Sequence, residues 1–157
     1  MSPDLDQLLC ILDRAYDRQS WHGTNLRGSI RGLSLEQVAW RPAPGRHCIW
    51  EVVVHAAYWK YAVRRRLTGE RRGSFPLKGS NWFVRPETGT RAGWEADVRL
   101  LEQTHRALRE AIARLPATAL RRTAPNSRVS NFDLIAGIAA HDLYHAGQIQ
   151  LLKRLSR

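Results

Sequence analysis

Residues 94–115 carry an unbroken helical repeat of mostly apolar side chains, and this repeat constrains the fold more than any other feature of the sequence. Its members are alternately four and three residues apart, which places all of them on one face of an α-helix. They are Trp94, Val98, Leu101, His105, Leu108, Ile112 and Leu115. A stripe sustained over this length is typical of a helix packed in a bundle.

Three further segments favour long helices. The chain is apolar nearly all round from 49 to 67, which predicts a helix that is buried on most faces. The β-branched run at 52–54 suggests a strand by itself, but the apolar run is too long for one. Residues 3–16 and 130–155 carry helical stripes of their own. With no internal repeat, we expect an all-α fold, a four-helix bundle that forms a single domain over residues 1–157.

Polar residues mark where several helices begin. Ser2 precedes a proline and can cap the first helix. The stripe of that helix stops at "SWHG" (20–23), where either one long helix bends or two helices meet. The pattern "SLEQ" (34–37) predicts a capping box that opens a short helix, and Ser130 with Asp133 predicts a similar start for the last helix.

A long irregular loop is expected between the second and third long helices. Residues 69–90 are rich in Gly, Pro and Ser and show no hydrophobic period. Unstructured connections of this length are uncommon inside a compact domain and are often functional. The loop contains Trp82, whose side chain we expect either to cover an open site as a lid or to plug one end of the bundle.

The net charge of +11 raises the question of nucleic-acid binding. The chain has 25 basic and 14 acidic residues, and only three of the basic residues are lysines. The arginines are scattered in short runs, without zinc-finger spacing or another nucleic-acid-binding motif. We therefore expect a solvated basic surface rather than a nucleic-acid interface.

The sequence also indicates a compartment. No apolar run approaches the roughly 18 residues that a membrane span needs. The N-terminus has early acids and lacks the basic segment of a signal peptide. Cys10 and Cys48 show no C-x-x-C spacing and fit a reducing environment. We expect a cytoplasmic protein with no membrane partner.

Histidines interrupt two of the buried stripes at mid-length. His141 and His145 are four residues apart in the last helix, so their imidazoles lie roughly 6 Å apart on one face. His55 lies inside the buried helix at 49–67. Because a buried imidazole is costly without a partner, we predict that these three histidines bind one divalent metal ion. Three protein ligands are typical of catalytic sites, which leave one coordination position open.

Other polar residues leave alternatives open. His105 is either a rival third or fourth ligand or a hydrogen-bonded core residue. Asp142 points about 100° away from the ligand pair and is expected to be a surface acid or an outer support of the site. Gln148 is expected to bind a coordinated water or a neighbouring carbonyl. His22 and His47 lie beside helix breaks and are expected at the surface or in caps.

Four stretches of the sequence resemble the DinB/YfiT-like superfamily of metal-dependent four-helix-bundle enzymes. They are "WHG" (21–23), "IWEVVVHAAYW" (49–59), "NW" (81–82) and "HDLYHAGQIQLLKR" (141–154), in that order along nearly the whole chain. The resemblance implies a metal held by one histidine of the second helix and two, four apart, of the last. These are His55, His141 and His145, the three that the stripes indicate.

The resemblance also implies a chemistry. Nickel or zinc would be the metal, and a low-molecular-weight thiol or water would be activated for transfer to, or hydrolysis of, a small-molecule substrate. Cys48 stands where a Ser or Thr cap is expected, which either weakens the cap or places a thiol near one end of the bundle. The sequence names no general base. A homodimer is a further hypothesis, and the alternative function is a non-catalytic metal-binding bundle that acts as a sensor or an interaction protein.

Overall fold

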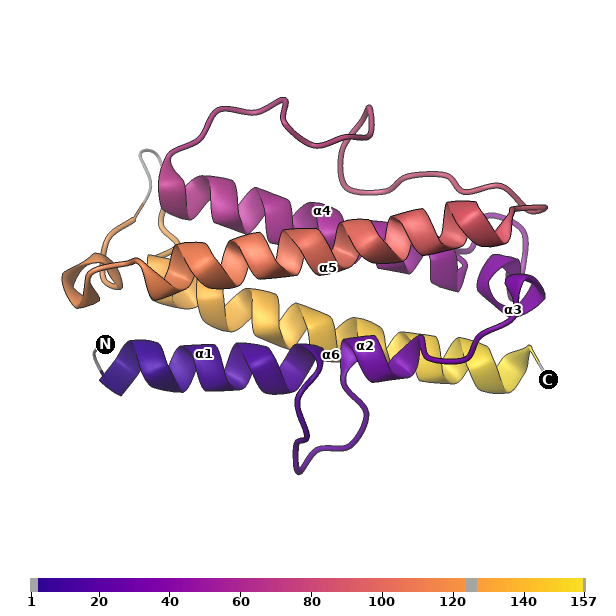
Figure 1. Cartoon of the computed structure of the whole chain (residues 1–157), viewed down its shortest axis with the longest axis horizontal. Helices are drawn as coiled ribbons and strands as arrows, with labels where there is room; N and C mark the ends of the chain where they lie inside the picture. The colour runs from indigo at the N-terminus through magenta and orange to yellow at the C-terminus, as the bar shows by residue number, and fades with distance from the viewer. Residues whose placement is uncertain (1–2, 124–126, 157) are drawn as a thin grey trace.

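The computed structural model describes residues 3–123 and 127–156, and these residues form an all-α fold, as predicted (Figure 1). No strand occurs in the described ranges, where Thr123 and Ser130 form an isolated β-bridge. The predicted cap Ser2 lies outside these ranges. The helices are α1 (Pro3–Tyr16), α2 (Leu26–Ser29), α3 (Leu35–Ala39), α4 (Ile49–Thr68), α5 (Arg91–Ala113), the 3₁₀ helix η1 (Ala117–Ala119) and α6 (Asn131–Leu155). None of these helices combines the length and apolarity of a membrane span.

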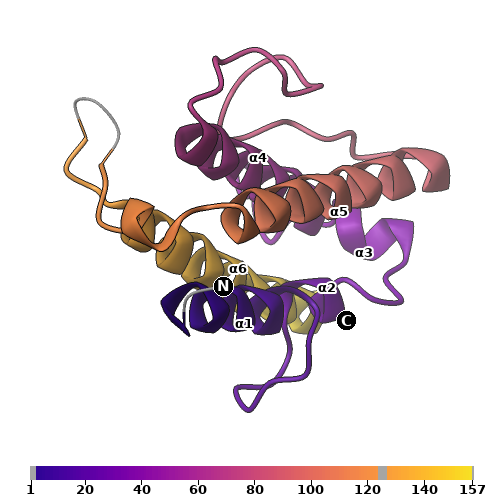
Figure 2. The ribbon, with the colours of Figure 1, turned by 60° about the vertical axis from the view of Figure 1, so that its left-hand side comes forward.

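Four long helices build the bundle, and α1 and α2 share one position in it. Helix α4 packs against α5 and α6, and α1 packs against α6 and α5. Figures 1 and 2 show α1 and α2 following one another along α6, with residues 17–25 leaving the bundle between them. Two helices therefore meet at this point, and the alternative of one bent helix is wrong.

Helix starts follow the predicted capping chemistry in two places. Ser34 and Gln37 form a capping box at α3, and Ser130 and Asp133 form one at α6. Cys48 occupies the N-cap position of α4 without a side-chain hydrogen bond, so the cap is weakened as expected. Cys48 is 1% exposed, and burial raises the pKa of its thiol, so the thiol near this end of the bundle is buried.

The predicted irregular loop is present between α4 and α5, at residues 69–90. Gly69 ends α4 in the left-handed conformation, with φ of 76°. The far end of the loop presses against the bundle at Gly89, where an added Cβ would overlap the indole of Trp50. That indole donates from Nε1 to Oδ2 of Asp97 at 2.6 Å. The end of the loop is therefore held against α4 and α5.

A polar layer divides the core into two apolar clusters. One cluster joins α2, α3 and the N-terminal halves of α4 and α5 to the C-terminal half of α6. The other joins α1 to the opposite halves of α4, α5 and α6. Between them, Lys60 of α4 and Asp142 of α6 are fully buried and form an ion pair, with Nζ and Oδ2 2.5 Å apart. The surface position expected for Asp142 is therefore wrong.

The Lys60–Asp142 pair is stabilised by mutual charge and opposed by burial. Burial lowers the pKa of Lys60 and raises the pKa of Asp142, while each partner's charge acts in the other direction. Removing one partner leaves the other without compensation in an apolar environment, which is the costly arrangement for a buried ion. The pair therefore fixes how α4 and α6 face each other.

We expect Lys60→Met to lower the free energy of unfolding at pH 7 by about 3–5 kcal/mol, because Asp142 loses its partner in the buried ion pair. The double variant Lys60→Met/Asp142→Leu should recover most of this loss, since no unpaired ion remains. Urea unfolding of Lys60→Met, Asp142→Leu and the double variant measures the coupling free energy between the two side chains. A double variant no more stable than the single ones would contradict the assignment.

Candidate metal centre

The three predicted histidines come together between α4 and α6. The ligand atoms of His55, His141 and His145 all lie within 4.8 Å of one another. His141 Nε2 is 3.1 Å from Nε2 of His55 and 3.1 Å from Nε2 of His145. His55 and His145 are buried and His141 is half-buried. The turn of helix between His141 and His145 thus brings both rings onto the face that meets α4.

The outer ring nitrogens show where the hydrogens are. His55 Nδ1 lies 2.8 Å from the carbonyl oxygen of Asn81, and His145 Nδ1 lies 2.7 Å from Oε1 of Gln148. Since both partners are acceptors, each Nδ1 carries a hydrogen and each Nε2 presents a lone pair to the cluster. One hydrogen on His141 Nε2 can satisfy only one of these two lone pairs.

This arrangement fits a shared cation. A divalent ion bonded to imidazole at about 2.0–2.1 Å holds neighbouring nitrogens roughly 3.0–3.4 Å apart, which matches the two separations from His141 Nε2. His141 Nδ1 is buried and has no hydrogen-bond partner among the described residues. With a hydrogen on that nitrogen, His141 would present a third lone pair from Nε2.

The imidazoles are neutral and ready to bind. Burial, together with the neighbouring imidazoles, lowers the pKa of His141 to about 3. Burial also lowers the pKa of His55 to about 4, against the opposing hydrogen bond to Asn81. The pKa of His145 is lowered by burial as well. All three imidazoles are therefore uncharged at neutral pH, with one hydrogen per ring, as metal ligation requires.

The long loop holds His55 through Asn81, which also binds Trp59. Asn81 has a φ of 65°, a left-handed conformation that asparagine tolerates better than most residues. Its side-chain Oδ1 accepts from Trp59 Nε1 at 3.0 Å while its carbonyl accepts from His55. The sequence pattern "NW" did not predict this clamp, because a carbonyl acceptor has no signature in residue type.

Trp82 lies on the histidine cluster and not in the end of the bundle. Its ring stacks on His55 at 3.8 Å between centroids and on His47 at 3.6 Å. It also lines a cavity of about 250 Å³ beside the cluster. The other lining residues are His47, Val52, Gln148, Leu151 and Leu152. The cavity is mainly apolar, and His47 and Gln148 are among its lining residues.

Glu51 holds the surroundings of Trp82 in place, which the sequence analysis did not foresee. Arg41 donates to both carboxylate oxygens of Glu51, at 2.7 and 2.8 Å. His47 Nδ1 lies 2.9 Å from Oε2, and the backbone N–H of Arg85 donates to Oε1 at 3.3 Å. The carboxylate thus joins α4 to the segment after α3 and to the long loop. His47 is exposed, as predicted, and has contacts on both sides.

The remaining candidates lie elsewhere. His105 is not part of the ligand cluster: its ring stacks on Tyr16 at 3.6 Å, and Nδ1 is 3.3 Å from Lys60 Nζ. Burial and the Lys60 charge lower its pKa to about 2. It is a core residue of the polar layer, so a ligand role is wrong. Gln148 binds the His145 ring, which neither expected role included, and His22 is exposed as predicted.

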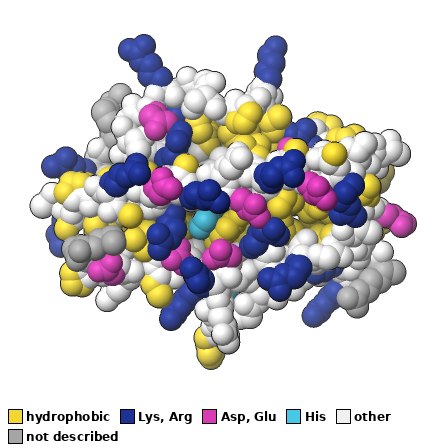
Figure 3. All heavy atoms as spheres, viewed as in Figure 1, with side chains coloured by type: hydrophobic (Ala, Val, Ile, Leu, Met, Phe, Trp, Pro, Cys, Tyr) yellow, Lys and Arg dark blue, Asp and Glu magenta, His cyan; other side chains and the backbone are white. Residues whose placement is uncertain are grey.

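The visible surface does not form a uniform basic face. Figure 3 shows acidic side chains interspersed with Lys and Arg over the side of the molecule that carries α1 and α5. Several of these charges are paired across helices, such as Arg27 with Glu102 and Arg109 with Asp13. On this side, some of the basic side chains are therefore neutralised by acidic partners.

A family model described as the DinB superfamily matches residues 18–149, a segment that includes all three histidines and both long-loop residues that support His55. Neither the curated proteins nor the solved structures include a significant match to the chain.

We expect protonation of Glu51 to destabilise the protein in acid. Burial raises the pKa of Glu51, but hydrogen bonds from Arg41, His47 and Arg85 outweigh it and lower the pKa from 4.5 to about 2. Because the folded-state pKa is depressed, this stabilisation is complete above pH 4.5 and is lost as the pH falls towards 2. Its full size is about 3 kcal/mol.

The measurement is urea unfolding between pH 7 and 2.5. Glu51→Gln should lower stability at pH 7 by about 2–3 kcal/mol and flatten the acid dependence. Glu36→Gln, a change at an exposed position of α3, is the matched control and should leave both unchanged. An acid dependence in Glu51→Gln equal to that of the unmodified protein would refute this account.

Proposed function

The chain belongs to the DinB superfamily, and from that premise we propose that it is a metal-dependent enzyme whose centre is formed by His55, His141 and His145. The observation that carries the proposal is the convergence of three Nε2 atoms whose rings are held in place from outside. In the described residues, this group contains no carboxylate and no cysteine. Three protein ligands are characteristic of catalytic zinc sites, whereas structural sites usually have four.

The three ligands of the proposed site are neutral, and this affects how strongly a bound ion would acidify a coordinated group. A divalent ion held by neutral nitrogens alone would keep its full charge and lower the pKa of a coordinated water or thiol by several units. We propose nickel or zinc as the metal, and a low-molecular-weight thiol or water as the activated group. Transfer to, or hydrolysis of, a small-molecule substrate is the proposed reaction.

The residues around the histidines have distinct tasks in this proposal. Asn81 and Gln148 fix the two outer ring nitrogens, so the Nε2 lone pairs of His55 and His145 stay directed inward. Trp82 covers one face of His55 and limits access of water. The apolar cavity beside it offers room for the non-reacting part of a substrate.

The proposal assigns no general base. His47 lies at the cavity edge but is engaged with Glu51 and Trp82. The cytoplasmic location and the homodimer expected above stay predictions.

We expect metal content to depend on all three ligands. His55→Ala, His141→Ala and His145→Ala should each reduce bound nickel or zinc from about one ion per chain to a small fraction, because two imidazoles hold a divalent ion far more weakly. His22→Ala removes an exposed histidine and should retain full metal content. Elemental analysis after extensive dialysis gives the result. Full metal content in all three variants would show that these histidines do not bind the metal.

We expect the metal-loaded protein to bind a thiol or to hydrolyse ester-type substrates. Isothermal titration with glutathione, mycothiol and bacillithiol should give heat with one of them, and the His141→Ala variant should give none. If no thiol gives heat on titration, a metal-dependent esterase or amidase activity is the expected alternative result. Stoichiometric metal with neither thiol binding nor hydrolysis would favour the non-catalytic sensor or interaction protein.

A further inference from the structure

A second cavity lies outside the histidine cluster, between the long loop and α4. Its volume is about 410 Å³, and residues 72–73 and 75–80 of the loop form its outer wall. Tyr58, Tyr61 and Arg65 form its α4 side. It shares no lining residue with the cavity beside Trp82.

Aromatic packing holds the wall of this cavity in place. Phe75 of the loop meets Tyr58 edge to face, with centroids 5.3 Å apart, and lies 5.4 Å from the ring of Tyr61. The backbone N–H of Gly73 donates to the Tyr61 hydroxyl at 3.2 Å. Phe83 packs on Phe75 from the core side at 5.3 Å. The cavity is therefore a formed feature with flat apolar surfaces.

Cations without acidic partners line the same cavity. Arg65, Arg72 and Lys78 are among its lining residues, and no acid is. Within the part of the chain that the structure describes, none of the three forms an ion pair with a carboxylate, whereas the neighbouring Arg64 pairs with Glu70 at 2.6 Å. Arg65 instead donates to the carbonyl oxygen of Glu70 at 3.3 Å.

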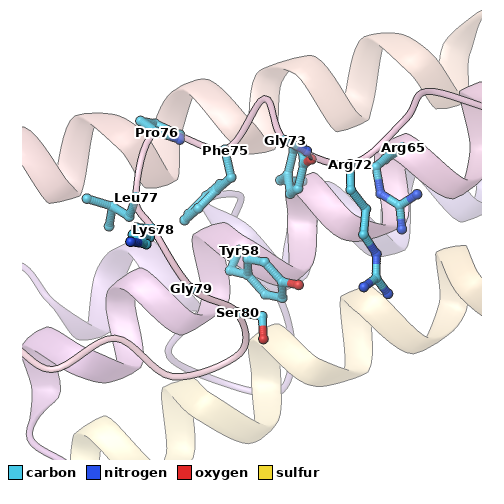
Figure 4. Close-up of a pocket in the computed structure, with 11 residues that line it drawn as sticks. Tyr58, Arg65, Arg72, Gly73, Phe75, Pro76, Leu77, Lys78, Gly79 and Ser80 are labelled. Carbon is cyan, nitrogen blue, oxygen red and sulfur yellow. Dashed lines mark hydrogen bonds between the residues drawn. The ribbon is translucent and has the colours of Figure 1, made fainter.

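The cations and the aromatic rings occupy different parts of the cavity. Figure 4 shows Arg65 and Arg72 at one end of the cavity, and Phe75 pointing towards Tyr58 in the middle. Lys78 lies at the opposite end in this view. Two guanidinium groups at one end match the fork geometry of phosphate oxygens. The middle of the cavity offers faces and edges for a planar ring.

We infer that this cavity binds an organic phosphate monoester that carries an aromatic ring, with the phosphate at Arg65 and Arg72 and the ring against Phe75 and Tyr58. A phosphate monoester carries nearly two negative charges at neutral pH, so it compensates two adjacent arginines better than a carboxylate does. The inference goes beyond the proposed function, because it requires no metal and uses none of the three histidines.

The test is calorimetric titration of 1-naphthyl phosphate into the whole protein, with and without added zinc. One molecule should bind per chain in both conditions, and affinity should fall as salt rises because the charges are partly exposed. Inorganic phosphate lacks the ring and 1-naphthol lacks the charge, so each should bind at least tenfold more weakly. 1-Naphthoate should bind with intermediate affinity.

Matched arginine variants locate the site. Arg65→Ala and Arg72→Ala should each weaken binding of 1-naphthyl phosphate roughly five- to tenfold, the size expected for loss of one charged contact at a half-exposed site. Arg66→Ala and Arg71→Ala remove the adjacent charges, which do not line the cavity, and should change affinity less than twofold.

Two results would overturn the inference. Equal weakening by all four arginine variants would mean attraction to the general positive field and no specific site. An absence of heat with 1-naphthyl phosphate at millimolar concentration would mean that the cavity does not take this class of ligand. Neither result bears on metal content, so failure here is distinct from failure of the metal centre.

Discussion

The buried pairing of Lys60 with Asp142 is the constraint on which the arrangement of the candidate site depends. Lys60 lies five residues after His55 on α4, and Asp142 directly follows His141 on α6. Successive residues of a helix point about 100° apart, so the rotation of α6 that directs Asp142 into the core also sets the direction of His141. The ion pair and the histidine cluster therefore specify the same relative position of α4 and α6. The large desolvation cost of an unpaired charge makes other positions unfavourable.

The polar layer around Lys60 and Asp142 also includes His105 and Tyr16. His105 stacks on Tyr16, and Lys60 Nζ lies 4.9 Å above the same tyrosine ring. The Tyr16 hydroxyl and Asp142 Oδ1 are buried and lack hydrogen-bond partners among the described residues. Groups of this kind are costly in an apolar core. A polar layer that contains such groups therefore contributes more to fixing the relative position of α4 and α6 than to the overall stability of the fold.

Periodicity in the sequence predicted the helices and the grouping of the histidines for a clear physical reason. The repeat at 94–115 and the i, i+4 spacing of His141 and His145 are properties of a helix alone, so no knowledge of the partner is needed. His55 could be added because it interrupts a helix that is largely apolar. The ends of α5 differ from the repeat, since α5 runs over Arg91–Ala113 and begins at a Thr90 cap that apolar spacing does not report.

Contacts between segments distant in the sequence could not be predicted in the same way. Lys60 is a cation within a largely apolar run, and its pairing with Asp142 spans 82 positions. The clamp at Asn81 depends on a backbone carbonyl and on a left-handed φ, neither of which leaves a pattern in residue types. Gln148 was correctly placed on the ligand face, but its partner depended on the rotation of the His145 ring.

The long loop combines a part fixed by the core with a part that mainly faces outward. From Asn81 to Gly89 it is held by His55, Glu51 and the Trp50 indole, so insertion or bulky replacement there would disturb the bundle. Residues 72–80 pack on the rest of the protein through Phe75, Leu77 and Gly73 and are otherwise exposed. Directed evolution of ligand preference therefore has a natural target in this outer stretch, where side chains can be exchanged with little effect on the imidazole cluster.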